Sequence, residues 1–342
     1  MKIRNLNKVE SRRGFIKHVA AFGGAAWLAG NVANAIASPL NANAVPLNTN
    51  AIPGDWSKQM GLQLYTVRDL MLNDMEGTIA KVAEIGFKDI EPINYGTLSP
   101  KQYRDLFDKY GLRVPSTHGS ATAGPDLEKQ LEGFQTIGIK YTAIRPAPGA
   151  NRPAGAQGGS AASATPRPAP PPATAESVKM TAQRHNENGK IAGKFGMKIL
   201  VHNGTGEFEL LADGKQTVYD VLLAETDPSL VAMELDITWA SIAGQNIVEL
   251  IKKHPGRFEL WHASDATGMK NLDPKLTPNQ RKPLCSLVPI GLGEIDYKSI
   301  FAHAETAGLR HYYVEQDNAA AWGDAMAATR TNFQGMTRVL TS

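Results

Sequence analysis

The chain has 342 residues, of which 42% are hydrophobic and 20% are charged, and this balance suits one large or two small globular domains. Residues 1–35 contain six basic and one acidic side chain, so the rest of the chain carries a formal net charge of −2, which argues against nucleic acid as a partner. The single cysteine, Cys285, excludes an intramolecular disulfide framework and a cysteine-rich zinc site.

The N-terminal 35 residues have the features of an export signal. Arg12 and Arg13 precede the apolar run VAAFGGAAWLAG, and Ala33-Asn34-Ala35 has the small-x-small pattern of a cleavage site. The apolar run is short and rich in Gly and Ala for a membrane span, and an uncleaved N-terminal anchor is the weaker alternative. We therefore predict a twin-arginine signal peptide at 1–35, export by the twin-arginine machinery, a periplasmic location and no membrane association after cleavage. Residues 36–57, rich in Asn, Pro and Ala, are interpreted as a linker.

From residue 58 onward, short apolar strands alternate with segments of helical periodicity. Several of the helices stop at a glycine, as expected for a C-cap. The Ala/Pro/Gly-rich segment 147–175 interrupts this alternation without resetting it, and its composition predicts a disordered insertion. The predicted strands are 61–67, 87–93, 112–119, 139–146, 197–204, 230–237, 257–263 and 310–316, and the predicted helices are 74–85, 99–110, 125–137, 177–195, 216–225, 247–253, 297–307 and 322–340.

This pattern predicts the fold class: an α/β protein with a (β/α)8 TIM barrel over residues 58–342. Eight strands alternating with helices are what such a barrel needs. A doubly wound open sheet is the rival fold. It is disfavoured because no glycine fingerprint follows the first strand and because the strand count reaches eight.

Ionisable side chains stand at the ends of six predicted strands. In a β/α barrel the carboxyl ends of the strands meet on one face, where function resides, and buried charges there are costly unless they are paired. Two imidazoles and two carboxylates form a ligand set suited to Mn²⁺, Co²⁺, Fe²⁺ or Zn²⁺. We predict that one such ion per chain is bound by His202, Asp236, His262 and Glu315, with Glu91 and His118 as substrate contacts or as partners of a ligand.

Six stretches of the chain match a known family as a set: VPSTHG with His118, KILVHNGTGEFE with His202, MELDITWA with Asp236 and Trp239, HPGRFELWHASD with His262, IGLGEID at 290–296, and YYVEQD with Glu315. Through them the chain resembles the xylose isomerase-like barrel family, also called sugar phosphate isomerases/epimerases, across residues 60–340 apart from the insertion. The resemblance implies a divalent metal held by strands five to eight, which binds a sugar carbonyl and a neighbouring hydroxyl while carboxylates move a proton.

Three positions depart from the family pattern. Many members carry a glutamate at the position of His202, where it is both a ligand and one of two proton-transferring carboxylates. Related sequences often have a histidine at Gly204 and a lysine at Ser264. Proton exchange between two glutamates is therefore in doubt here, and the lysine that could bind an anionic substrate is replaced by Ser264.

The residues suggest a mechanism of proton transfer next to a carbonyl. Glu315, Glu91 or Glu207 is the candidate base, and His118 is the candidate acid that returns a proton. His118, Trp239 and Asn203 are the candidate substrate contacts.

The leading hypothesis is an exported, metal-dependent isomerase or epimerase that acts on a small, unphosphorylated keto or aldo sugar. An alternative is a lyase or hydrolase of 3-keto-glycosides, because elimination needs one base and not a symmetrical pair. A non-catalytic sugar-binding protein is a third hypothesis, and an abasic-site endonuclease on the same barrel fits the charge least well. The substrate, the metal and the oligomeric state stay open at this point.

Overall fold

The computed structural model describes residues 54–93, 97–147 and 172–342, all of which belong to one compact unit, Asn48–Ser342. The predicted signal peptide, most of the predicted linker and nearly all of the 147–175 insertion lie outside these residues. Within the described part of the chain, no helix is both long enough and apolar enough to span a bilayer.

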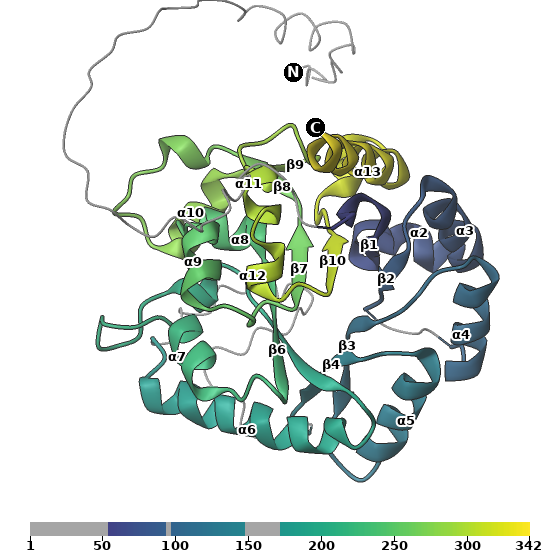
Figure 1. Cartoon of the computed structure of the whole chain (residues 1–342), viewed down its shortest axis with the longest axis horizontal. Helices are drawn as coiled ribbons and strands as arrows, with labels where there is room; N and C mark the ends of the chain where they lie inside the picture. The colour runs from purple at the N-terminus through teal and green to yellow at the C-terminus, as the bar shows by residue number, and fades with distance from the viewer. Residues whose placement is uncertain (1–53, 94–96, 148–171) are drawn as a thin grey trace, which may run out of the picture. The chain divides into compact units, whose positions relative to one another are not determined.

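Eight parallel strands form the central sheet, with helices between them (Figure 1). Their order is β2-β1-β10-β7-β6-β5-β4-β3. Backbone hydrogen bonds from Ile90 N to Arg113 O (2.8 Å) and from His118 N to Pro92 O (2.9 Å) join the two outermost strands of this order. The sheet is thus a nearly closed (β/α)8 barrel, and the predicted fold class is confirmed. The strands are β1 (Met60–Gln63), β2 (Asp89–Glu91), β3 (Ser116–Thr122), β4 (Tyr141–Arg145), β5 (Lys198–His202), β6 (Val231–Asp236), β7 (Leu260–Ala263) and β10 (His311–Val314).

The helices between the strands pack their apolar sides against the barrel, and most of them begin at a side-chain cap. Ser99, for example, accepts a hydrogen bond from Gln102 N, and Pro100 follows it at the first helical position. The helices are α2 (Arg68–Asn73), α3 (Met75–Ile85), α4 (Pro100–Lys109), α5 (Leu127–Ile137), α6 (Ala175–Gly193), α7 (Val218–Glu225), α8 (Ile237–Ile242), α9 (Ile247–Lys253), α10 (Pro278–Arg281), α11 (Tyr297–Phe301), α12 (Ala304–Ala307) and α13 (Ala325–Thr341).

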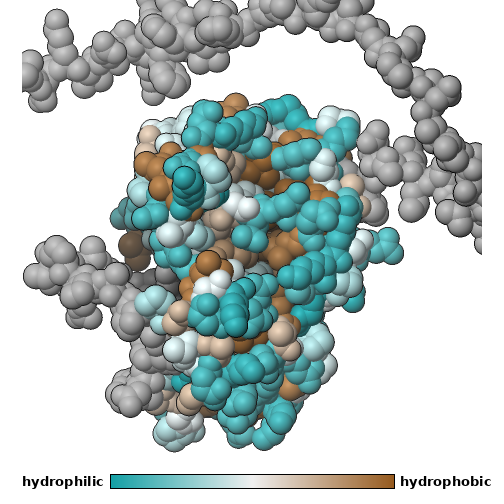
Figure 2. Space-filling model, turned by 90° about the vertical axis from the view of Figure 1, so that its left-hand side faces the viewer, coloured by the Kyte–Doolittle hydropathy of each residue, from teal (hydrophilic) through white to brown (hydrophobic). Residues whose placement is uncertain are grey.

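The surface matches this amphipathic arrangement. Figure 2 shows one side of the molecule, where hydrophilic residues dominate and apolar residues show between them. The largest buried side chains include Trp261, Phe258 and Phe301, which belong to the apolar layer that the strands and helices share. The ring centroids of Trp261 and Phe301 lie 5.2 Å apart in an edge-to-face arrangement, so Trp261 is a core residue.

The structure corrects the predicted elements at three places. The first strand ends at Gln63, because the chain turns there into the 3-10 helix Leu64–Val67. The predicted helix 297–307 is two short helices, α11 and α12. The predicted loop 264–292 contains an antiparallel pair, β8 (Asp265–Thr267) with β9 (Ser286–Val288), and also α10.

The β8–β9 pair is tied to the loop at 290–296 through Asp265. This buried carboxylate accepts hydrogen bonds from the backbone N–H groups of Gly291 (3.0 Å), Gly293 (3.0 Å) and Ile295 (3.2 Å). A Cβ atom at Gly293 would collide with the Asp265 carboxylate, so the close approach of the loop requires glycine there. The IGLGEID stretch therefore has a structural role next to β7.

Candidate metal centre at the carboxyl ends of the strands

Four side chains from four different strands meet at one end of the barrel. His202 ends β5, Asp236 ends β6, His262 lies in β7, and Glu315 directly follows β10. One nitrogen or oxygen atom of each side chain lies within 4.8 Å of the corresponding atoms of the other three. The parallel register explains this meeting, because Asp236 pairs with His262 across β6 and β7. The four residues predicted as metal ligands are therefore neighbours in space.

The donor atoms in this group have the arrangement that one cation would require. His202 Nε2 lies 3.6 Å from Asp236 Oδ2, and His262 Nδ1 lies 2.8 Å from Glu315 Oε2. Both nitrogens are buried and lack a partner in hydrogen-bonding geometry. Two atoms that each lie about 2.1 Å from one ion are about 3 to 3.5 Å apart, which is close to these separations. The residues present thus fit a divalent ion bound by two nitrogens and two carboxylates.

Asn203 fixes the orientation of Asp236. Its side-chain nitrogen donates to the backbone oxygen of Asp236 (3.1 Å), and its side-chain oxygen accepts from Asp236 N (3.0 Å). Asp236 Oδ1 caps α8 by accepting from Trp239 N (2.7 Å), which leaves Oδ2 facing His202. Asn203, predicted as a substrate contact, is 0% exposed. Its contacts are those of a residue that positions a ligand.

Below the strand ends lies a second layer of charged side chains, formed by Glu91, His118 and Glu234. His262 Nε2 contacts Glu91 Oε2 at 2.7 Å, and the other oxygen of Glu91 accepts a hydrogen bond from Ser116 Oγ. His118 Nε2 contacts Glu234 Oε2 at 2.7 Å, and Glu234 Oε1 lies 3.2 Å from His262 Nε2. Glu91 and Glu234 are both 0% exposed. Glu91, predicted as a base, a substrate contact or a partner of a ligand, is thus buried and contacts the ligand His262.

The electrostatics of this layer follow from burial and from its neighbouring charges. Burial and the nearby Glu234 carboxylate raise the pKa of Glu91. Burial also disfavours ionisation of Glu234, but His262 and His118 outweigh it and hold the pKa of Glu234 well below its ordinary value. Burial alone would lower the pKa of His118, but Glu91 and Glu234 outweigh it and raise that pKa to about 9. Both shifts favour the charged forms of Glu234 and His118, whose Oε2 and Nε2 atoms lie 2.7 Å apart.

The remaining predicted residues lie around this centre. His118 is 23% exposed through its side chain and so reaches the open side. Glu207 lies in the 3-10 helix Gly206–Phe208 and accepts a hydrogen bond from Gly204 N (2.7 Å). Trp239 is half-buried, and Lys282 Nζ stands 4.2 Å from the centre of its ring. The ammonium group of Lys282 therefore lies over the ring of Trp239, a predicted substrate contact.

Sequence reasoning missed three charged residues of this region: Glu234, Asp317 and Lys282. Glu234 and Asp317 each lie two positions from a predicted ligand, Asp236 and Glu315. Along a strand, positions two apart share a face, and this spacing was the available signal for Glu234. Burial, together with the nearby Glu315 and Asp236 carboxylates, raises the pKa of Asp317 to about 6. For Lys282, which lies in the loop after β8, the spacing offered no signal.

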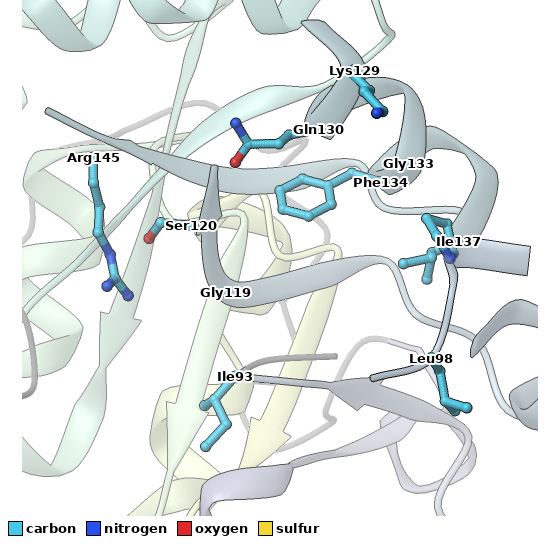
Figure 3. A pocket seen from close by; sticks show the side chains of 11 residues that line it. Ile93, Leu98, Gly119, Ser120, Lys129, Gln130, Gly133, Phe134, Ile137 and Arg145 are labelled. Carbon is cyan, nitrogen blue, oxygen red and sulfur yellow. The ribbon is translucent and has the colours of Figure 1, made fainter. Parts of the chain in front are cut away.

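A separate cavity of about 450 Å³ lies beside β3, α4 and α5. In Figure 3 the Phe134 ring, Ile137 and Leu98 form its apolar part, and Arg145 and Ser120 stand at its polar side. None of the histidines or carboxylates described above lines it. This cavity is therefore distinct from the candidate metal centre.

Comparisons with known proteins were made for sequence and for structure. No family model matches the chain. An inosose dehydratase of Geobacillus thermodenitrificans is 28% identical over 144 residues, which are 40% of this chain and 46% of that protein. The chain thus spans about half the length of this curated relative.

Solved structures match over more of the chain. A sugar phosphate isomerase/epimerase of Parabacteroides distasonis has a TM-score of 0.61 at 21% identity, covering 86% of this chain and 98% of that one. The IOLI protein with a binding zinc atom has a TM-score of 0.56 at 16% identity, covering 83% and 98%. The protein therefore shares its barrel fold with sugar phosphate isomerases/epimerases and with a zinc-binding barrel.

Proposed function

We propose that this protein is a divalent-metal-dependent enzyme that moves a proton on the carbon next to a carbonyl of a sugar, as an isomerase or epimerase. The observation that carries the proposal is the meeting of His202, Asp236, His262 and Glu315 at one end of the barrel, with donor atoms within 4.8 Å of one another. The zinc in a protein of the same fold and the relatives named as isomerase/epimerase and dehydratase support it.

These four residues would hold the ion, and a bound divalent ion would polarise the carbonyl and stabilise the negative charge that forms when the proton leaves. Glu315 is the carboxylate best placed to take that proton. Its side chain is 12% exposed, whereas Asp236 is 4% exposed and Glu91 and Glu234 are 0% exposed. Glu315 can therefore reach a molecule at the open end.

His118 is the residue placed to return a proton. It projects from β3, which lies beyond β1 and β2 from β10, the strand that precedes Glu315, and its side chain is 23% exposed. Glu234 contacts the Nε2 atom of His118. The His118 and His202 rings meet edge to face, with centroids 4.8 Å apart. A carboxylate base and an imidazole acid thus face one space from two sides.

Elimination is a second candidate outcome of the same first step. His202 stands where the family resemblance places a second proton-transferring glutamate, and Glu91, which could have replaced it, is buried against His262. Elimination needs one base, which takes the proton, and one acid, which protonates the hydroxyl or glycosidic oxygen that leaves. One carboxylate and one imidazole can supply both. The curated relative is named as a dehydratase, which also favours this outcome. The substrate would then be a keto-polyol such as inosose or a 3-keto-glycoside.

A proton-exchange experiment tests the shared step. The purified protein is incubated in D₂O with Mn²⁺ and, in separate reactions, a free ketose, inosose or a 3-keto-glycoside. We expect deuterium on the carbon next to the carbonyl in a recovered or isomerised sugar, or release of water or aglycone if elimination follows. A metal-loaded protein that exchanges no proton and releases nothing from any of the three would contradict the proposal and favour a non-catalytic binding protein.

We also propose that the enzyme works in the periplasm after twin-arginine export. The support is the Arg12-Arg13 pair followed by an apolar run and a small-x-small motif. Replacing both arginines by lysine should retain the protein in the cytoplasm, whereas the unchanged chain should appear in the periplasmic fraction with its first 35 residues removed. Mass spectrometry of the intact exported protein checks the cleavage site.

A further inference from the structure

Both nitrogens of His262 face carboxylates, on opposite sides of the ring. Nδ1 lies 2.8 Å from Glu315 Oε2 at the strand ends. Nε2 lies 2.7 Å from Glu91 Oε2 and 3.2 Å from Glu234 Oε1 on the inner side. An imidazole binds a metal ion through either nitrogen, so this ring has two directions in which it can serve as a ligand.

The inner side of His262 carries a second set of donor atoms. His118, His202, Glu234 and His262 each offer one atom within 4.8 Å of the other three. The three imidazole rings contact one another, with centroid separations of 4.8 Å (His118–His202), 4.9 Å (His118–His262) and 4.8 Å (His202–His262). This set contains three nitrogens and one carboxylate, whereas the strand-end set contains two of each.

Two atoms of this inner set are buried and lack a hydrogen-bond partner. They are Glu234 Oε1 and His202 Nε2, and Glu234 is 0% exposed. A buried polar atom without a partner costs about 1 to 3 kcal/mol, so such atoms are usually satisfied by a group that binds there. The buried carboxylates of Glu91 and Glu234 would together balance the charge of one divalent ion on this side of the ring.

We propose that the barrel holds a second cation position, deeper than the strand-end centre and formed by His118, Glu234 and His262 Nε2 with His202 shared between the two. Because nitrogen ligands favour ions of borderline softness, the inner position takes Zn²⁺ and the more oxygen-rich strand-end position takes Mn²⁺. The two positions share His202 and His262, so a chain holds one ion at either position. The inference builds on the strand-end centre of the proposed function, but not on any sugar chemistry.

Filling the inner position rearranges the layer below the strand ends. An ion bound to His262 Nε2 displaces the contact with Glu91, and one bound to His118 Nε2 displaces the contact with Glu234 Oε2. The imidazole that was placed to return a proton would then be a metal ligand. Zinc at the inner position therefore inhibits the proton transfer that manganese at the strand ends supports.

Metal affinities of two single variants test this proposal without a substrate. Zn²⁺ and Mn²⁺ dissociation constants are measured by chelator competition for the unchanged protein, Glu234→Gln and Asp236→Asn. We expect Glu234→Gln to weaken Zn²⁺ binding at least 10-fold and Mn²⁺ binding less than 3-fold, and Asp236→Asn to show the reverse order, since each variant removes a charged ligand from one position only.

A matched control is Glu259→Gln, because this carboxylate lies just before β7, at the other end of the strand, where Lys198 Nζ contacts it at 2.5 Å. It should change neither affinity. Should Glu234→Gln fail to fold, as judged by circular dichroism, His118→Asn tests the same position. Crystals soaked with each metal and measured at its absorption edge locate the ions directly.

The outcomes separate this inference from the proposed function. Equal weakening of both metals in each variant, or zinc density at the strand ends, overturns the inner position and leaves the proposed function intact. Absence of any bound divalent ion overturns both. A preference of zinc for the inner position with no proton exchange by the manganese form supports this inference and contradicts the proposed function.

Discussion

The two halves of the barrel contribute different things to the centre. The half from β5 to β10 ends in four potential ligands, His202, Asp236, His262 and Glu315. The half from β1 to β4 contributes Glu91 and His118, which contact the inner sides of that set. The difference teaches that the strand-end donor atoms come from one set of strands, whereas the opposite set contributes Glu91, which contacts the inner nitrogen of His262.

The largest effect is expected from removing a ligand in the first of these halves. Asp236→Ala should reduce the Mn²⁺ bound at the strand ends from about one ion per chain to nearly none, and His262→Ala should remove the ion from either position, because each change breaks up the ligand set. Elemental analysis of protein purified without chelator measures this, and proton exchange should disappear with the metal. Full metal occupancy in both variants would show that the ion, and with it the functional half, lies elsewhere.

Glu315→Gln separates binding from proton transfer within the same half. The amide oxygen can still contact a metal but cannot take a proton, so in saturating Mn²⁺ proton exchange should fall by about 10²- to 10⁴-fold. Glu207→Gln is the comparison, because the Glu207 side chain already accepts a hydrogen bond from Gly204 N. Its loss should be below about 10-fold on the same scale. A larger loss in Glu207→Gln than in Glu315→Gln would reassign the base.

Glu91→Gln tests whether the half from β1 to β4 acts through its partner. The Glu91 carboxylate fixes the His262 ring through Nε2, so its loss should weaken metal binding by about 10- to 100-fold without removing a ligand. Titration of the protein with Mn²⁺ measures the change. Ser116→Ala, which removes only a hydrogen bond to Glu91, should have a smaller effect in the same direction. Unchanged affinity in Glu91→Gln would mean that the two halves are independent.

The smallest effect concerns a histidine on an outer helix that has no carboxylate partner. Burial, and to a lesser extent Arg184, lowers the pKa of His185 on α6 to about 4. Between pH 6.5 and 4 the unfolded chain therefore binds a proton that the folded chain does not, and the folded state is destabilised by up to about 3 kcal/mol as the pH falls through this window. Unfolding by urea should show this pH slope in the unchanged protein and a weaker one in His185→Leu. Metal binding above pH 6.5 should be equal in both.

Much of the barrel could be predicted from local pattern, because strand and helix periodicities differ and caps mark the helix ends. Seven of the eight strands were placed within a few residues, and the helix Ile247–Lys253 was placed at its observed bounds. Errors occurred where tertiary contacts override local pattern. Gln63 ends β1 because its side chain caps the next 3-10 helix. The β8–β9 pair includes Asp265, which accepts a hydrogen bond from the N–H group of Gly291, some 25 residues later.

The four strand-end residues of the site could be predicted for a different reason. Parallel strands bring their carboxyl ends together, so a side chain that follows an apolar strand has a predictable place. The contacts of a residue inside the barrel are not predictable in this way. The two-residue spacing from Asp236 places Glu234 on the same face of the strand, but it does not show which histidines Glu234 contacts. The role of Asn203 depends on where the Asp236 backbone lies.

The hydrogen bonds between Asp265 and the loop at 290–296 bear on how this barrel can be re-engineered. Asp265 is three residues beyond His262 on the same stretch of chain, so the loop and the histidine are mechanically linked. Grafting a foreign loop over 290–296 would disturb these three amide donors and leave the buried carboxylate with the N–H group of Ala266 as its remaining backbone donor. Segment 269–284, whose side chains are mostly exposed, is the better place to install variation. Diversity introduced there alters the rim while the histidine keeps its support.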